Sequence, residues 1–131
     1  MIKQVVLTGT FCMVCGILFS QQTLPLKNYL ALRDSTNSID VVILQGKGAS
    51  INFEGRNVSY FNSMIENKTA AKSKAPLGGT IMWLIDGREF ISGNYFLGDS
   101  TGYVVMQKDG KEYVNQLNKA GISFLKSEIK Y

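Results

Sequence analysis

The pattern of apolar and polar positions predicts an antiparallel sheet in the C-terminal half of the chain. Runs of apolar or alternating residues, separated by glycine-containing turns, are typical of strands. The strands predicted in this way cover residues 80–85, 88–92 with a continuation at 95–97, 103–108 and 111–116. Asp86-Gly87 and Asp109-Gly110 lie between them, and Asp-Gly is a favoured two-residue hairpin turn. We therefore expect two Asp-Gly hairpins.

The N-terminal half combines helical and strand patterns. The elements predicted there are a helix over 25–33, strands over 39–44 and 49–53, and a helix that Asn57 caps and that ends near residue 67. Asn118 is predicted to cap a final helix. The expected fold is one α+β domain over 21–131. Its antiparallel sheet is built from the two Asp-Gly hairpins plus an N-terminal hairpin, with two to three helices packed mainly on one face.

A two-residue turn fixes which residues of a hairpin lie opposite each other. It sets Leu84 opposite Glu89 and Trp83 opposite Phe90 in the first hairpin, and Met106 opposite Tyr113 in the second. These pairings predict the two faces of the sheet. One face would carry the aromatic set Trp83, Phe90, Met106 and Tyr113. The other would carry the aliphatic set Met82, Ile91, Val105 and Val114. We expect the helices to pack on the aliphatic set, in a two-layer arrangement. The aromatic set then needs cover from the N-terminal hairpin, a second subunit or a ligand, because large apolar patches are seldom left exposed.

Two interpretations of the aromatic set are open from the sequence. Aromatic residues on a sheet either fill the core or form an exposed recognition surface, for which Tyr95 and Phe96 would be the rim. The segment 67–79, rich in small residues and lysine, is expected to be a mobile loop that either is solvated or contacts an anionic partner. The candidate binding residues are therefore Trp83, Phe90, Met106, Tyr113, Tyr95, Phe96, Lys68, Lys72 and Lys74.

The start of the chain has the pattern of a secretory signal. A lysine near the N-terminus precedes an apolar run over 5–19, and Ser20 offers a small residue before a cleavage point. A transmembrane helix needs about 20 apolar residues, and this run is shorter. We predict a signal peptide over 1–20, export to the periplasm or the exterior, and no stable membrane insertion after cleavage. The alternatives are an uncleaved anchor and a buried N-terminal strand or helix. Cleavage would remove Cys12 and Cys15, the two cysteines of the chain.

The residue inventory excludes several kinds of catalytic site. The chain has no histidine, which removes Ser-His-Asp and Cys-His catalysis and histidine-ligated zinc. The acidic residues show no spacing that implies a shared site, and no glycine-rich phosphate-binding motif occurs. We therefore predict no catalytic residue, no metal and no cofactor. A formal net charge of +4 is ordinary for a soluble domain and does not indicate nucleic-acid binding.

The function expected from these patterns is that of a small exported binding protein, not an enzyme, which recognises a protein partner as an inhibitor, immunity or adaptor protein does. Recognition would use the aromatic set and the basic loop from Lys68 to Lys74. One alternative is a small hydrolase or lyase that works with carboxylates. Another is a structural subunit of a homo-oligomer or surface assembly that buries the aromatic set.

Overall fold

Within the residues described by the computed structural model, 22–70 and 74–128, the chain forms a six-stranded antiparallel sheet and three helices, which confirms the predicted α+β class. The elements are α1 (Leu26–Ser35), β2 (Ser38–Ile43), β3 (Ala49–Glu54), α2 (Arg56–Asn62), β4 (Leu77–Ile85), β5 (Arg88–Leu97), β6 (Gly102–Lys108), β7 (Lys111–Gln116) and α3 (Lys119–Ser127). The predicted signal peptide 1–20 lies outside the described residues. None of the helices in the described ranges is long and apolar enough to span a membrane.

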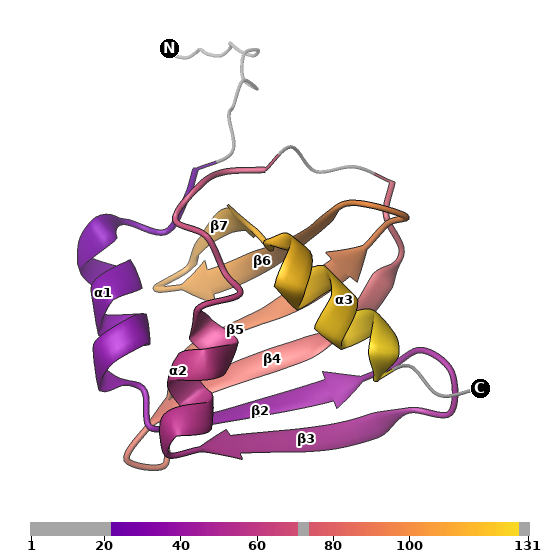
Figure 1. Cartoon of the computed structure of the whole chain (residues 1–131). Helices are drawn as coiled ribbons and strands as arrows, with labels where there is room; N and C mark the ends of the chain where they lie inside the picture. Colours follow the sequence, from indigo (N-terminus) through magenta and orange to yellow (C-terminus); the bar gives the residue numbers. More distant parts are fainter. Residues whose placement is uncertain (1–21, 71–73, 129–131) are drawn as a thin grey trace, which may run out of the picture.

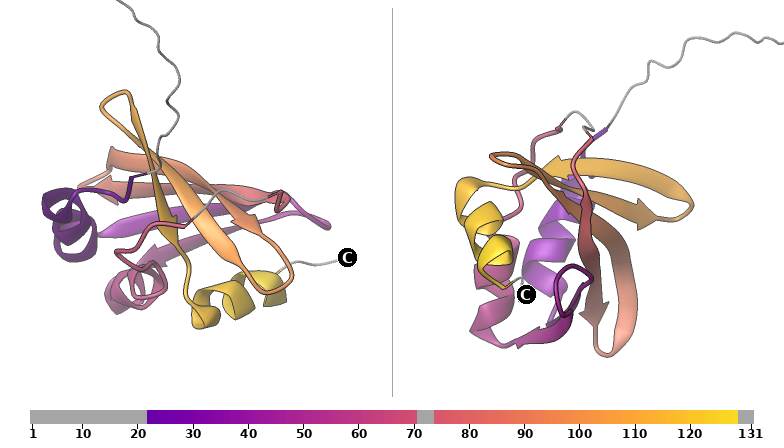
Figure 2. Two further views of the ribbon diagram at one scale, coloured as in Figure 1. Left: turned by 90° about the horizontal axis from the view of Figure 1, so that it is seen from above. Right: turned by 90° about the vertical axis from the view of Figure 1, so that its right-hand side faces the viewer.

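The strands are ordered β3-β2-β4-β5-β6-β7, and each neighbouring pair is antiparallel. All three helices cover the same face of the sheet, which we call the inner face (Figure 1). The sheet is strongly twisted, so that β6 and β7 cross β2 and β3 at a steep angle when viewed from above (Figure 2). The result is a two-layer domain in which none of the described helices lies on the outer face.

Both predicted Asp-Gly turns are confirmed. Asp86 and Asp109 have φ angles of 51° and 52°, and the glycines that follow them have φ angles of 81° and 76°. Two successive residues with positive φ match the twist of a hairpin, and Asp-Gly tolerates this conformation. Asn37 holds the first turn in place, because its amide donates to the Asp86 carboxylate at 2.8 Å and its oxygen accepts from the Asp86 main-chain N–H at 3.1 Å.

The first hairpin departs from the predicted register three residues from its turn. Leu84 lies opposite Glu89 as expected, but Trp83 lies opposite Ile91 because the chain is irregular at this point and Phe90 has no partner. The predicted pairing of Trp83 with Phe90 is therefore wrong. One extra residue in a strand moves the residues beyond it to the other face, which explains why Ile91 shares the face of Trp83. The second hairpin keeps its predicted register throughout.

The helices pack on the aromatic side of the sheet, so the expectation that they would cover the aliphatic set is wrong. Trp83 is fully buried on the inner face, and its Nε1–H donates to Asn62 Oδ1 of α2 at 2.9 Å. Asn62 in turn donates to the Leu32 carbonyl of α1 at 3.0 Å. One buried amide thus connects β4 to both N-terminal helices. The large side chain of Trp83 buries more surface there than an aliphatic residue would, which favours this packing.

Val105 and Val114, from the predicted aliphatic set, lie on the outer face instead. They form a small cluster with Tyr103, against which Phe96, Ala70 and Ala75 pack. Ala70 and Ala75, which lie between α2 and β4, therefore cover the outer face beside β6 and β7. Met82, further along the sheet, is 37% exposed.

The second helix is shorter than predicted. It begins at Arg56 after Gly55, so Asn57 lies in its first turn and is not its cap. It ends at Asn62, yet Met64 and Ile65 beyond its end remain buried as the apolar spacing indicated. Apolar spacing therefore identified the core residues but not the helix end.

Two further details decide how the C-terminal half is built. Asn118 caps α3 as predicted, because its Oδ1 accepts from the Gly121 main-chain N–H at 2.8 Å. Gly93-Asn94, which separates the strand expected over 88–92 from its continuation at 95–97 and could have formed a bulge or bend, lies inside the continuous strand β5. A Cβ at Gly93 would lie 2.6 Å from the Val105 carbonyl oxygen, so this glycine permits close approach of β6 and does not mark a bend.

The two edges of the sheet differ. The edge of β7 is paired along both halves, because Val114 N–H donates to the Gln22 carbonyl at 2.7 Å and Gln116 N–H donates to the Lys68 carbonyl at 2.8 Å. Glu66 N–H also donates to the Gln116 carbonyl at 2.8 Å. At the opposite edge, β3 pairs only with β2 in the part of the chain that the structure describes. One edge is closed by main-chain pairing and the other is open.

Candidate functional site

Three of the predicted binding residues lie in the core. Trp83 and Met106 have no exposed surface, and Tyr113 is 8% exposed. All three belong to the main hydrophobic core on the inner face. Of the two interpretations that the sequence left open for them, the structure shows the core. A recognition surface therefore has to lie elsewhere.

Tyr95, predicted as part of a surface rim, is also fully buried. Its ring covers the glycine pair of β4, since a Cβ at Gly79 would lie 2.8 Å from it. An aromatic ring laid over strand glycines replaces the packing that their missing side chains would provide. Its hydroxyl has no hydrogen-bond partner among the described residues, and burial raises the pKa of Tyr95 to about 12.

This burial predicts a specific pH dependence of stability. An unfolded tyrosine ionises near pH ~10, whereas folded Tyr95 keeps its proton to about pH 12. Ionisation of this tyrosine therefore does not affect the free energy of unfolding below pH ~10. As the pH rises from ~10 to about 12, ionisation favours the unfolded state and the free energy of unfolding falls. We expect Tyr95→Phe to match or exceed the wild-type stability at neutral pH, because it removes an unpaired hydroxyl. Urea unfolding should show a smaller fall in stability above pH ~10 for Tyr95→Phe. Equal slopes in both proteins would contradict this assignment.

Phe90 and Phe96 are half-buried and occupy different places. The Lys108 ammonium lies 4.6 Å from the centre of the Phe90 ring, which is a cation–π arrangement. Phe96 stacks on Tyr103 with ring centres 5.0 Å apart and an angle of 16° between the planes. Phe96 thus belongs to the outer-face cluster, and the structure does not bring it together with Phe90.

The predicted basic loop is only partly described. Lys68 and Lys74 are exposed, while Lys72 lies outside the described residues. Lys68 is anchored through its main chain to Gln116 of β7, and its side chain borders a groove. The structure therefore links one residue of the predicted basic loop to a hollow that sequence reasoning did not identify.

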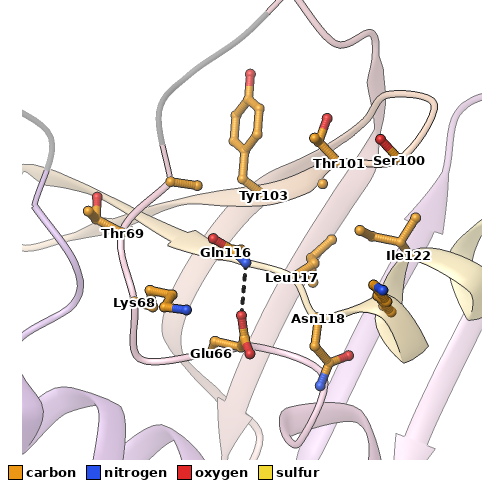
Figure 3. Close-up of a pocket in the computed structure, with 13 residues that line it drawn as sticks. Glu66, Lys68, Thr69, Ser100, Thr101, Tyr103, Gln116, Leu117, Asn118 and Ile122 are labelled. Atoms are coloured by element: carbon orange, nitrogen blue, oxygen red, sulfur yellow. Dashed lines mark hydrogen bonds between the residues drawn. The ribbon is translucent and has the colours of Figure 1, made fainter.

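This hollow, which we call the β7 groove, has a volume of about 740 Å³. Three segments border it: residues 66–70, the loop before β6, and the junction of β7 with α3. Its lining comprises Glu66, Lys68, Thr69, Ala70, Ser100, Thr101, Gly102, Tyr103, Gln116, Leu117, Asn118, Lys119 and Ile122. Figure 3 shows Lys68 and Thr69 on one side and Ser100 and Thr101 on the other. The lining combines amides, hydroxyls and charges with an apolar floor.

The segments around the β7 groove are held by main-chain hydrogen bonds. Leu117 N–H donates to the Gly102 carbonyl at 3.0 Å, and Asn118 N–H donates to the Met64 carbonyl at 2.9 Å. The loop before β6 is closed by Gly98 N–H, which donates to the Thr101 carbonyl at 2.8 Å. The groove is therefore a preformed feature of the domain.

The charged side chains that line the β7 groove differ in their contacts and exposure. Gln116 donates through its side-chain amide to Glu66 Oε1 at 3.0 Å, the contact drawn at the centre of Figure 3. Lys68 and Lys119 are both exposed at the rim. Glu66 is the only carboxylate in the described lining, and two-carboxylate hydrolysis needs a second one within about 5–10 Å. The groove presents net positive charge and neutral hydrogen-bonding groups, which suits binding of a segment that carries negative charge.

Sequence reasoning missed most of the groove for a definite reason. Its lining comes from segments separated by tens of residues, and each side chain is unremarkable in its own segment. One signal was present in the sequence. The polar loop before β6 and the capping residue Asn118 both contain residues typical of turns, and they lie at the same end of two adjacent strands. No protein-family model, curated protein or solved structure matches the chain, so the geometry of the groove carries the functional argument.

Proposed function

We propose that this chain is a small exported binding protein and that it recognises an acidic segment of a protein partner in the β7 groove. The observation that carries the proposal is the groove itself. A volume of about 740 Å³ falls within the range of about 300–1,000 Å³ that is common for binding sites. Loops positioned by a rigid scaffold are the usual place for recognition.

The chemistry of the lining supports a peptide segment as the ligand. Ser100, Thr101 and Asn118 offer hydroxyl and amide groups of the kind that pair with a peptide main chain. Leu117 and Ile122 provide apolar surface at the floor. The two exposed lysines at the rim favour a partner with acidic side chains, by charge complementarity.

Export is supported by the signal pattern of 1–20. Gln22, just beyond the predicted cleavage point, already pairs with β7 through its carbonyl. Leu24, two residues later, is buried with 1% of its surface exposed. Cleavage after Ser20 would leave both of these contacts intact.

A matched pair of charge-reversal variants tests the proposal. The groove variant is Lys68→Glu with Lys119→Glu, and the control is Lys27→Glu with Lys111→Glu, which changes the net charge equally at exposed positions away from the groove. Each chain is immobilised and exposed to the extracellular or periplasmic proteins of its source. We expect a protein that binds the wild type and the control, and whose affinity for the groove variant is at least about tenfold lower, because attraction becomes repulsion at two sites.

The contrary outcome is equally clear. If the wild type and the groove variant retain the same proteins with the same affinity, the groove is not the recognition site. Circular dichroism of both variants should match the wild type, since all four lysines are exposed.

A further inference from the structure

The open edge of β3 is a second surface that the proposed function does not use. Natural sheets protect their edges with lysine, proline, bulges or covering segments, because unpaired N–H and C=O groups bind other strands. The strand from Ala49 to Glu54 contains neither lysine nor proline, and its register with β2 is regular over its whole length. In contrast, the edge of β7 is covered by Gln22 and Lys68.

The order of residues in β3 is self-complementary when two copies run antiparallel. Ala49, Ile51 and Phe53 face the helices, while Ser50 and Asn52 face the other way. A two-fold axis at Ile51 sets Ala49 opposite Phe53 and Ser50 opposite Asn52. Apolar residues then lie opposite apolar residues and polar residues lie opposite polar ones. The apolar and polar faces of the sheet therefore continue across the contact.

The charges at the two ends of β3 are also complementary. Lys47 lies in the turn just before the strand, and Glu54 is its last residue. Both side chains are exposed, and neither forms an ion pair within the part of the chain that the structure describes. Antiparallel pairing about Ile51 brings the Glu54 end of one strand next to the turn that carries Lys47 in the other copy. Two-fold symmetry makes this contact twice.

From these observations we infer that the edge of β3 binds the β3 edge of a second copy of this chain, which joins the two sheets into one continuous antiparallel sheet. The contact uses main-chain hydrogen bonds for affinity and the two Lys47–Glu54 pairs for register. It leaves the β7 groove of each copy free, because β3 and β7 are at opposite edges of the sheet.

A charge-swap cycle on the purified chain, with reductant present, tests this inference. Sedimentation equilibrium should show a reversible, concentration-dependent dimer. Lys47→Glu and Glu54→Lys should each raise the dimer dissociation constant about tenfold, because either one replaces two attractive pairs with two repulsive ones. The double variant Lys47→Glu/Glu54→Lys should return the constant to within about threefold of the wild-type value. Lys111→Glu, at the start of the distant strand β7, serves as the control.

Hydrogen exchange locates the contact independently. Amides of residues 49–54 should exchange more slowly as the protein concentration rises, while amides of β7 should not change. A chain that stays monomeric up to millimolar concentration would overturn the inference. So would a dimer that neither single reversal weakens, a double variant that fails to recover, or protection confined to another element. Each of these results leaves the β7 groove proposal standing, since that proposal is tested by lysines of another surface.

Discussion

Trp83→Ala should cost about 3–5 kcal/mol of unfolding free energy, the largest loss that we expect from any single substitution. The side chain is fully buried, and its removal leaves a cavity between β4 and the helices. It also leaves the Asn62 Oδ1 atom without the N–H that it accepts at 2.9 Å. Domains of this size have a total stability of roughly 5–15 kcal/mol, so the variant should be close to unfolding. Urea denaturation followed by circular dichroism measures the loss.

Trp83→Phe separates the two contributions. Phenylalanine fills much of the space but has no N–H, so we expect an intermediate loss. Since Trp83 is the only tryptophan, its fluorescence in the wild type reports the packing directly. A wild-type emission maximum typical of solvent-exposed tryptophan, or a loss below about 1 kcal/mol for Trp83→Ala, would contradict the core position.

Asn115→Leu is the second substitution with a large expected effect. Asn115 is fully buried in β7, and its Oδ1 accepts from the Leu24 main-chain N–H at 2.9 Å. Its Nδ2 donates to the Glu66 carbonyl at 2.8 Å. Leucine has a similar shape but satisfies neither group, and each unsatisfied main-chain group costs about 1–3 kcal/mol. Urea unfolding should therefore show a lower free energy of unfolding, to which the loss of both hydrogen bonds contributes.

The matched control is Asn94→Leu, the same change at an exposed strand position. Its effect should stay within about 0.5 kcal/mol. Because Asn115 holds both the N-terminal segment and residue 66 against β7, Asn115→Leu should also increase proteolytic cleavage near Leu24 and weaken binding at the β7 groove. Equal stability of the two variants would show that the amide is not structurally important.

The parts of the fold that follow from local chemistry could be predicted from the sequence. Both Asp-Gly turns and the Asn118 cap depend on a few neighbouring residues, and all three are confirmed. The strands that meet at these turns follow directly. These elements were sufficient to predict the α+β class.

What the sequence could not predict depends on contacts between distant residues. The irregularity at Phe90 changes the register without any glycine or proline to mark it. Both faces of the sheet are apolar, so composition alone did not show that Asn62 pairs with Trp83 and brings the helices to that side. The β7 groove needs three distant segments at once, and Lys68 was the one groove residue found in advance.

The pairing of Gln22 with Val114 has a consequence for how this domain forms. The nearby bond from Leu24 N–H to Asn115 Oδ1 joins residues 91 positions apart, so the first segment of the domain acquires its place only after the last strand has been made. Contacts of such long sequence separation slow folding, because the chain loses much of its freedom before they form. During synthesis, the growing chain cannot close its sheet. It completes its structure only after β7 has been made.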